Sequence, residues 1–312
     1  MLLRQHDTTS TRFERAEQRV FDSCGIAVTT RSVQLREPSL RVRLLESGEG
    51  QPLLFVGGDS AVAAAWAPLV AKLPNRRAIL LDRPGFGLGD GFDYRRADLR
   101  RHGVRLLGSL LDALGLENVA VVGSSGGGEW SLWLALDAPD RVRALVPMGI
   151  PAVCLPGLRP TAGVRMLSIP GLGRLCFAVP LPSAAATGRM LADADAHLLD
   201  HPDIVAAYHA ARRLPGYGAA AAAIFRRSLR VGGRARRTMV LTDAEQAQIS
   251  QPVLFVWGDR EPLGGPEIAH RAAGLMPNAR VEVVRDAWHH PWLADPTHVA
   301  HLLSAFLEEH DA

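Results

Sequence analysis

Residues 119–128 read VAVVGSSGGG, and this stretch decides the fold class of the chain. The apolar run Val119–Val122 predicts a buried strand, and a helix-like segment follows at 129–136. Between them stands a G-x-S-x-G pattern, Gly123 to Gly127, with Ser125 at its centre. A strand, a sharp turn and a helix are the context in which this pattern presents a serine above a sheet. We therefore predict that Ser125 lies on a strained turn at a strand end.

Short apolar runs alternate with helical patterns on both sides of this turn. The runs predict strands at 32–35, 40–46, 53–56, 78–81, 142–148, 252–257 and 281–284, and helices at 11–21, 62–73, 99–114 and 298–309. Continuous apolar strands that alternate with helices are typical of a mostly parallel sheet covered on both faces. The expected fold class is α/β, with about eight strands.

The alternation stops near Ile150 and resumes near Pro252. The residues between are first rich in proline and glycine and then rich in alanine with helical patterns. A segment of about a hundred residues is within the size of a small domain. We therefore divide the chain into a core of residues 1–150 and 250–312, with an N-terminal helical extension at 1–28, and an inserted helical segment at 151–249.

Composition excludes several classes of function. The chain has 312 residues, 47% of them hydrophobic, and a formal net charge of +3, which is too small to indicate nucleic-acid binding. The three cysteines, Cys24, Cys154 and Cys176, form no C-x-x-C pair, so we expect no disulfide framework and a reducing, cytoplasmic location. No signal peptide and no run of about 18 apolar residues is present, so no membrane partner is expected.

Two later strand ends carry an acid and a histidine. Gly258-Asp259-Arg260-Glu261 follows the expected strand 252–257, and Trp288-His289-His290 follows the strand 281–284. The carboxyl ends of parallel strands lie at one edge of a sheet, so Ser125, an acid and His289 should meet there. A histidine can take the serine's proton, and a carboxylate can fix the tautomer of that histidine.

With these motifs in order, the chain resembles the α/β-hydrolase family from Arg41 to its C-terminus. The matching segments are the Gly57-Gly58 loop, the turn at 82–87, the turn at 123–127, the acid loop at 258–261 and the His289 loop. The turn at 82–87 is similar to that of members acting on small esters and on carbon–carbon bonds of diketone-like acids. The resemblance implies that the segment 151–249 is a helical cap.

The resemblance implies a role for each catalytic residue. Ser125 would be the nucleophile, His289 the base, and Glu261 the acid that orients the base, with Asp259 as the alternative acid. Family members usually carry aspartate where Glu261 stands. The backbone N–H of Gly126 would supply one donor of the oxyanion hole.

The second oxyanion donor would be the N–H of Asp59 or Gly58. The family usually begins this loop with His-Gly, whereas this chain reads Gly57-Gly58-Asp59. A carboxylate aimed at a developing oxyanion would oppose catalysis, so Asp59 must point away, bind a cationic group of the substrate or be protonated.

The inserted segment supplies apolar side chains, so we expect a small, largely apolar substrate with one polar reacting group. The residues expected to bind it are Gly57, Trp288, Met166, Phe177 and Met190. The expected reaction is cleavage of an ester, thioester, lactone or activated carbon–carbon bond through an acyl-enzyme, without metal or cofactor. Two alternatives stay open: a cyclase, lyase or epimerase that uses His289 and Asp59, and a non-catalytic ligand-binding protein.

Two charged clusters have no place in this scheme. Asp193, Asp195, His197, Asp200, His201 and Asp203 include an i, i+4 histidine pair, but Leu198 replaces the glutamate of the HExxH zinc pattern, which favours a solvated helix end over a metal site. The arginines between Arg226 and Arg237 favour a solvated face, with docking of an anionic substrate or an acidic carrier protein as the alternative. No G-x-G-x-x-G follows the first strand, so a nicotinamide or flavin cofactor has no support. The sequence leaves open whether the protein forms a homodimer.

Overall fold

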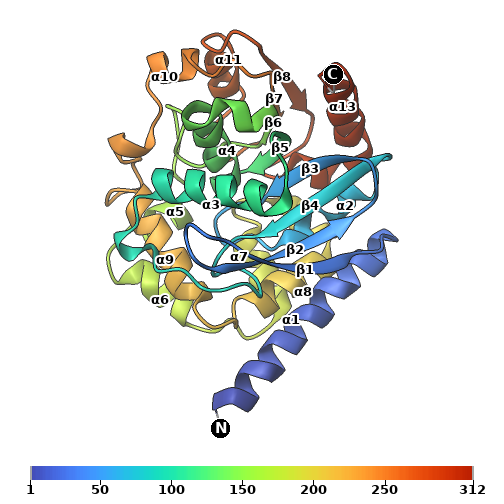
Figure 1. Ribbon diagram of the computed structural model, residues 1–312. Helices are drawn as coiled ribbons and strands as arrows, with labels where there is room; N and C mark the ends of the chain where they lie inside the picture. The colour runs from blue at the N-terminus through green and yellow to red at the C-terminus, as the bar shows by residue number, and fades with distance from the viewer. Residues whose placement is uncertain (1, 311–312) are drawn as a thin grey trace.

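A single eight-stranded sheet organises the computed structural model, which describes residues 2–310 (Figure 1). Its strands are β1 (Thr29–Gln34), β2 (Arg41–Ser47), β3 (Gln51–Val56), β4 (Arg76–Asp82), β5 (Val119–Ser124), β6 (Val142–Met148), β7 (Val253–Gly258) and β8 (Ala279–Val284). They lie in the order β1-β2-β4-β3-β5-β6-β7-β8. Only β2 runs antiparallel to its neighbours, so the mostly parallel α/β sheet expected from the sequence is confirmed.

Helices cover both faces of this sheet. On one face, α3 (Leu99–Leu114) packs against α4 (Gly126–Asp137); on the other, α2 (Ala67–Val70) and α12 (Pro291–Ala294) pack with α13 (Pro296–Glu308) (Figure 1). The central strands β3, β5 and β7 are almost entirely buried because they are covered on both sides. This burial explains why their sequences are continuous apolar runs without alternation.

The order of the strands reverses at β3. From β3 the chain adds β4 on one side and then crosses to place β5 on the other. Ligand sites in open α/β sheets lie at the carboxyl ends of strands beside such a switch point. The loops after β3 and β5 are therefore the first place to look for a site.

Six α-helices fill the connection between β6 and β7. They are α5 (Ala162–Leu167), α6 (Leu172–Ala178), α7 (Ala184–Leu191), α8 (Pro202–Ala211), α9 (Tyr217–Ser228) and α10 (Asp243–Ala247); α11 (Glu267–Ala273) then links β7 to β8. Short 3-10 helices also occur, among them η1 (Ala63–Trp66), η2 (Tyr94–Arg96), η3 (Pro139–Arg141), η4 (Ala196–Asp200) and η5 (Arg237–Met239). We call residues 149–252 the helical segment.

The N-terminal helix α1 (Leu2–Cys24) extends well beyond the predicted helix 11–21 and packs against α8 (Figure 1). A buried ion cluster anchors it to the sheet: Glu17 pairs with Arg43 of β2, and Arg43 Nε lies 2.7 Å from Asp82 Oδ2 at the end of β4. Burial of its carboxyl raises the pKa of Glu17 to about 8, although Arg43 opposes the shift. No helix among the described residues is long and apolar enough to cross a bilayer.

Candidate active site

Ser125 occupies the turn between β5 and α4 with φ 49° and ψ −122°, a backbone conformation that a non-glycine residue adopts only when its surroundings enforce it. Close packing of the turn enforces it here. A Cβ on Gly127 would lie 1.9 Å from the carbonyl oxygen of Val56, and one on Gly123 would lie 2.7 Å from the carbonyl oxygen of Gly127. The glycines of the motif are thus required by the crowding that holds Ser125 at the strand end.

The loop after β3 lies directly beside this serine. A Cβ placed on Gly58 would come within 2.9 Å of Ser125 Cβ, so only glycine allows this approach. Helix α4 begins at Gly126, whose N–H therefore has no acceptor within the helix. Gly126 and the Gly58-Asp59 loop consequently flank Ser125, where an oxyanion hole would have to be.

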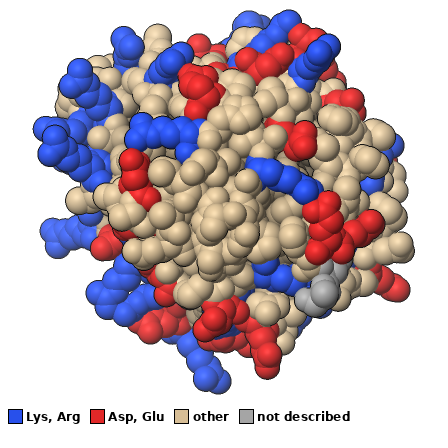
Figure 2. Space-filling model, turned by 90° about the horizontal axis from the view of Figure 1, so that it is seen from above, with Lys and Arg blue, Asp and Glu red and all other residues tan. Residues whose placement is uncertain are grey.

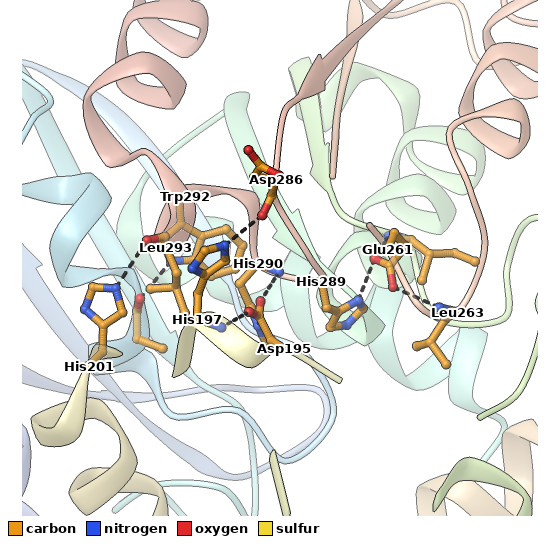
Figure 3. A network of polar contacts seen from close by, with 12 residues as sticks. Asp195, His197, His201, Glu261, Leu263, Asp286, His289, His290, Trp292 and Leu293 are labelled. Atoms are coloured by element: carbon orange, nitrogen blue, oxygen red, sulfur yellow. Dashed lines mark hydrogen bonds and ion pairs between the residues drawn. The ribbon is translucent and has the colours of Figure 1, made fainter. Parts of the chain in front are cut away.

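His289 reaches the same place from the loop after β8. Its Nδ1 lies 2.8 Å from Glu261 Oε2, and both side chains are buried (Figure 3). The Glu261 carboxylate also accepts the N–H of Ile150 at 3.1 Å on Oε2 and the N–H of Leu263 at 3.2 Å on Oε1. These bonds fix the carboxylate, and the carboxylate in turn leaves Nε2 as the ring nitrogen that can accept a proton.

The alternative acid points elsewhere. Asp259 is exposed to solvent, and its backbone N–H donates to the carbonyl oxygen of Val284. Arg260, which could have paired with Glu261 on a surface, pairs instead with Asp286. The structure therefore brings Glu261, and not Asp259, to the imidazole of His289.

The surroundings of His289 stabilise its protonated form. Burial alone would lower the pKa of this imidazole, but the charge and hydrogen bond of Glu261, with a further contribution from the charge of Asp195, raise the pKa above its ordinary value of 6.5. The same arrangement stabilises an imidazolium formed during proton transfer.

Asp59 is held by an ion pair inside the protein. Arg83 Nη1 lies 2.9 Å from Asp59 Oδ1 and 3.2 Å from the carbonyl oxygen of Gly57. The guanidinium carbon of Arg83 stacks 3.9 Å from the ring centroid of Trp130. Asp59 therefore binds a cation, but that cation is Arg83 of the chain itself and not the cationic substrate group considered from the sequence.

A second carboxyl lies near this pair. Glu129, on the first turn of α4, is completely buried, and burial followed by the charge of Asp59 raises its pKa well above 4.5, with Arg83 opposing. Burial disfavours the charged form of a carboxyl. Arg83 thus offsets the charge of Asp59, while burial opposes ionisation of Glu129.

A cavity of about 260 Å³ brings these residues together. Its lining includes Ser125, His289, Gly58 and Asp59 from the sheet side, and Met166, Phe177 and Met190 from the helical segment. Two residues expected at the substrate, Gly57 and Trp288, are not part of the lining. The carbonyl oxygen of Gly57 is bound to Arg83, and Trp288 is half-buried in the loop before His289.

Several lining residues were missed from the sequence. The cavity is also lined by Tyr208 of α8, by Arg212 in the turn that follows α8 and by Tyr217 of α9. Arg212 donates to the carbonyl oxygen of Cys176 at 3.1 Å, and the hydroxyl of Tyr217 donates to that of Ser60 at 2.7 Å. An arginine or tyrosine in a helical pattern carries no sign of facing a cavity, because that depends on how the helices pack.

The acidic and histidine-rich cluster at 193–203 holds the helical segment against the core (Figure 3). Asp195 binds His290, His197 Nε2 lies 2.8 Å from the carbonyl oxygen of Asp286, and His201 Nε2 lies 3.2 Å from that of Leu293. The expected solvated helix end is therefore wrong for Asp195, which is fully buried. Among residues 2–310, no group of three or more His, Cys, Asp or Glu side chains could hold a metal ion.

The arginines between Arg226 and Arg237 are exposed. Of the twelve arginines from Arg159 to Arg237, only Arg159 has a carboxylate partner among the described residues. In the view of Figure 2, Lys and Arg side chains gather along the edge toward which α6 and α9 lie in Figure 1. Most of the positive charge of the helical segment thus has no carboxylate partner among the described residues.

Comparison with known proteins identifies the family. A family model described as the alpha/beta hydrolase fold matches residues 51–166. A 2-hydroxymuconate semialdehyde hydrolase of Pseudomonas sp. (strain CF600) is 30% identical over 287 residues, covering 88% of this chain and 92% of the relative. A second 2-hydroxymuconate semialdehyde hydrolase, from Pseudomonas putida, is 28% identical, covering 87% of this chain and 92% of the relative.

Solved structures share the fold over nearly the whole chain. The carboxylesterase CesB from Bacillus subtilis superposes with a TM-score of 0.71 at 22% identity, covering 96% of this chain and 98% of that one. A meta-cleavage product hydrolase from Pseudomonas fluorescens IP01 superposes with a TM-score of 0.71 at 20% identity, covering 89% and 97%. The sheet, the order of the motifs and the similarity along most of the chain show that this protein belongs to the α/β-hydrolase family and is an α/β-fold hydrolase.

Proposed function

We propose that the protein is a serine hydrolase that cleaves an ester, thioester, lactone or activated carbon–carbon bond of a small, largely apolar substrate. The observation that carries the proposal is one cavity lined by both Ser125, on its strained turn, and His289, whose other ring nitrogen is bound by Glu261. A nucleophile, a base and a group that orients the base are the parts that this chemistry requires.

In the proposed reaction, Ser125 Oγ attacks the substrate carbonyl carbon while its proton passes to His289 Nε2. The backbone N–H groups of Gly126 and of Gly58 or Asp59 hold the resulting oxyanion. His289 then returns the proton to the leaving group, which departs as an alcohol, a thiol or a carbon acid. Water, activated by the same imidazole, hydrolyses the acyl-enzyme and restores Ser125.

The character of the cavity supports the proposed substrate class. Apolar side chains such as Met166, Phe177 and Met190 line most of it, while Asp59 and Arg212 add charge at separate places. Relatives named as 2-hydroxymuconate semialdehyde hydrolases and a neighbour named as a carboxylesterase support carbon–carbon bond and ester cleavage, respectively. We further propose that residues 151–249 act as the cap that closes over this substrate.

The Asp59–Arg83 pair favours hydrolysis over the non-hydrolytic alternative. The Asp59 carboxylate already forms an ion pair with the buried guanidinium of Arg83. A cyclase or epimerase mechanism that uses Asp59 as a base would have to break this pair. A non-catalytic ligand-binding role would not require the hydrogen bond between Glu261 and His289.

Two further proposals concern the partners and the location of the protein. The unpaired arginines from Arg226 to Arg237 support docking of an acidic carrier protein that presents a thioester. Three free cysteines and no disulfide among the described residues support a reducing, cytoplasmic location.

The test is a substrate panel assayed with the wild-type protein and with Ser125→Ala. The panel holds aryl esters, acyl thioesters, lactones and a carbon–carbon substrate with two conjugated carbonyl groups. We expect turnover of at least one class by the wild type and its loss in Ser125→Ala. Equal turnover by the two proteins would overturn the proposal.

A further inference from the structure

Asp195 is a buried carboxylate, and two of its three side-chain hydrogen bonds run to the loop that carries His289. Its Oδ2 lies 3.0 Å from His290 Nδ1 and accepts the backbone N–H of His290 at 2.7 Å (Figure 3). Its Oδ1 accepts the backbone N–H of His197 at 3.0 Å. The side chain is fully buried, so these contacts replace the water that a carboxylate would otherwise bind.

The residues around Asp195 bind the same loop on both sides of the catalytic histidine. We call residues 286–293 the histidine loop. His197 contacts the carbonyl oxygen of Asp286 at its start, and His201 contacts that of Leu293 at its end. All three contacts join the helical segment to the core, and Asp195 makes the central one.

From His290 the contact continues to the base and to the loop beside Ser125. The ring of His290 packs edge-on against His289, with centroids 5.0 Å apart, and edge-on against Trp292. Trp292 stacks on Trp66 at 4.0 Å and donates to the carbonyl oxygen of Ala65. Movement of His290 would therefore disturb His289 and the region that follows the Gly58-Asp59 loop.

We propose that Asp195 is a positioning residue for the catalytic base, so that His289 is correctly placed and charged only while the helical segment is seated on the core. This inference rests on the proposed function, since it assigns Asp195 a part in the work of His289. Two carboxylates then hold the histidine loop: Glu261 from the core binds His289 directly, and Asp195 from the helical segment binds its neighbour. The helical segment then closes over the substrate and places His289 for proton transfer at the same time.

Electrostatics agrees with this arrangement. The charged and titratable groups that face His289 are Glu261, Asp195 and His290, and both carboxylates favour the imidazolium. Burial opposes ionisation of Asp195, but the bonds and charge of His290 outweigh it and lower the pKa of this carboxyl. Asp195 therefore remains charged in the range where His289 titrates.

The experiment compares Asp195→Asn and Asp195→Ala with Asp200→Asn as the matched control. Asp200 lies in the same turn, but its side chain is 75% exposed and 3.4 Å from His197 Nδ1. Asparagine keeps an oxygen that can accept one His290 bond while it removes the charge; alanine removes both. We expect kcat to fall by about 10-fold in Asp195→Asn and about 100-fold in Asp195→Ala, with KM changed less, and no change in Asp200→Asn.

The pKa of His289, measured by NMR on labelled histidine, separates positioning of the base from mere support of the fold. Asp195→Asn should lower this pKa, and the acidic limb of kcat/KM should move to lower pH by the same amount. An unchanged pKa and an unchanged pH profile in a folded Asp195→Asn protein would overturn the inference. Because the NMR titration needs no turnover, it also decides the matter if the proposed hydrolysis fails.

A second variant covers the case in which the Asp195 variants do not fold. His290→Asn removes the ring bond to Asp195 from the core side, keeps the backbone N–H bond and leaves Asp195 in place. We expect this variant to lower kcat and to lower the pKa of His289, because Asp195 loses its bond to the ring that packs against His289. Wild-type values for both quantities would contradict the inference.

Discussion

Arg83 and Asp59 form an ion pair of 2.9 Å between guanidinium Nη1 and carboxylate Oδ1 beside Ser125. A Cβ on Gly126 would lie 2.3 Å from the same Asp59 oxygen, so the carboxylate is packed against the start of α4. A bare negative charge there would oppose an oxyanion, and Arg83 offsets it. The departure from His-Gly in the loop after β3 is thereby compatible with acyl transfer.

The first prediction compares two variants with the same substrate. Asp59→Asn removes the ion pair but leaves an oxygen for Arg83, so we expect the free energy of unfolding to fall by about 1–3 kcal/mol and turnover to fall only moderately. Ser125→Ala should abolish turnover without a loss of stability of this size. Chemical denaturation and steady-state kinetics measure both quantities. A larger loss of activity in Asp59→Asn than in Ser125→Ala would favour the non-hydrolytic alternative.

The second prediction separates the two acids of the loop after β7. Glu261→Gln should lower kcat by about 10³-fold or more, because the amide can impose the wrong tautomer on His289 and cannot stabilise its cation. Asp259→Asn serves as the control and should leave kcat unchanged, since Asp259 is exposed. Equal losses in the two variants would show that Glu261 does not orient the base.

The third prediction concerns pH. The base must be neutral to accept the serine's proton, and the pKa of His289 is raised above 6.5, chiefly by Glu261 against the effect of burial. We expect the acidic limb of kcat/KM to lie above pH 6.5 and to move to lower pH in Glu261→Gln. An acidic limb below pH 6.5 in the wild type would contradict this assignment.

The free energy of unfolding should fall with rising pH over the range in which His289 loses its proton and activity rises. A group whose folded-state pKa is raised contributes stability below its unfolded pKa of about 6.5 and loses it as pH rises through the folded pKa. His289 therefore makes the protein less stable over the range in which it becomes an active base. Denaturation curves of the wild type and of His289→Gln across this range test the point.

The fourth prediction concerns Glu129. Burial raises its pKa well above 4.5, so above pH 4.5 the unfolded chain loses a proton that the folded protein keeps, and stability falls as pH rises. Glu129→Gln removes this dependence and keeps the size of the side chain. We expect the variant to equal the wild type near pH 4 and to be the more stable protein at pH 8. A less stable variant at pH 8 would mean that Glu129 is ionised and paired with Arg83.

Local pattern was sufficient to predict the sheet and the turn that carries Ser125. Strands buried on both faces are continuous apolar runs, which are easily found in a sequence. Helix α3 and strand β6 were predicted with their observed bounds. Glycines at 123 and 127 revealed the turn because the backbone leaves no room for a Cβ. These features depend on residues that are close in sequence.

Features that depend on tertiary contact were not predictable in the same way. His197 and His201 were weighed as an i, i+4 pair on one helix face, but residues 196–200 form a 3-10 helix, and the two rings bind different carbonyl groups. The pairing of Asp59 with Arg83 joins the ends of two neighbouring strands, β3 and β4. No spacing rule connects them, because only the order of the strands in the sheet brings these ends together.

Covalent labelling with a fluorophosphonate, read by intact mass and by peptide mapping, tests the central claim most directly. The probe reacts with serines that a neighbouring base activates, and it needs no knowledge of the substrate. We expect one adduct on the wild type, located on Ser125, and none on Ser125→Ala. An adduct on another residue, or no adduct on a folded wild-type protein whose cavity admits the probe, would contradict it.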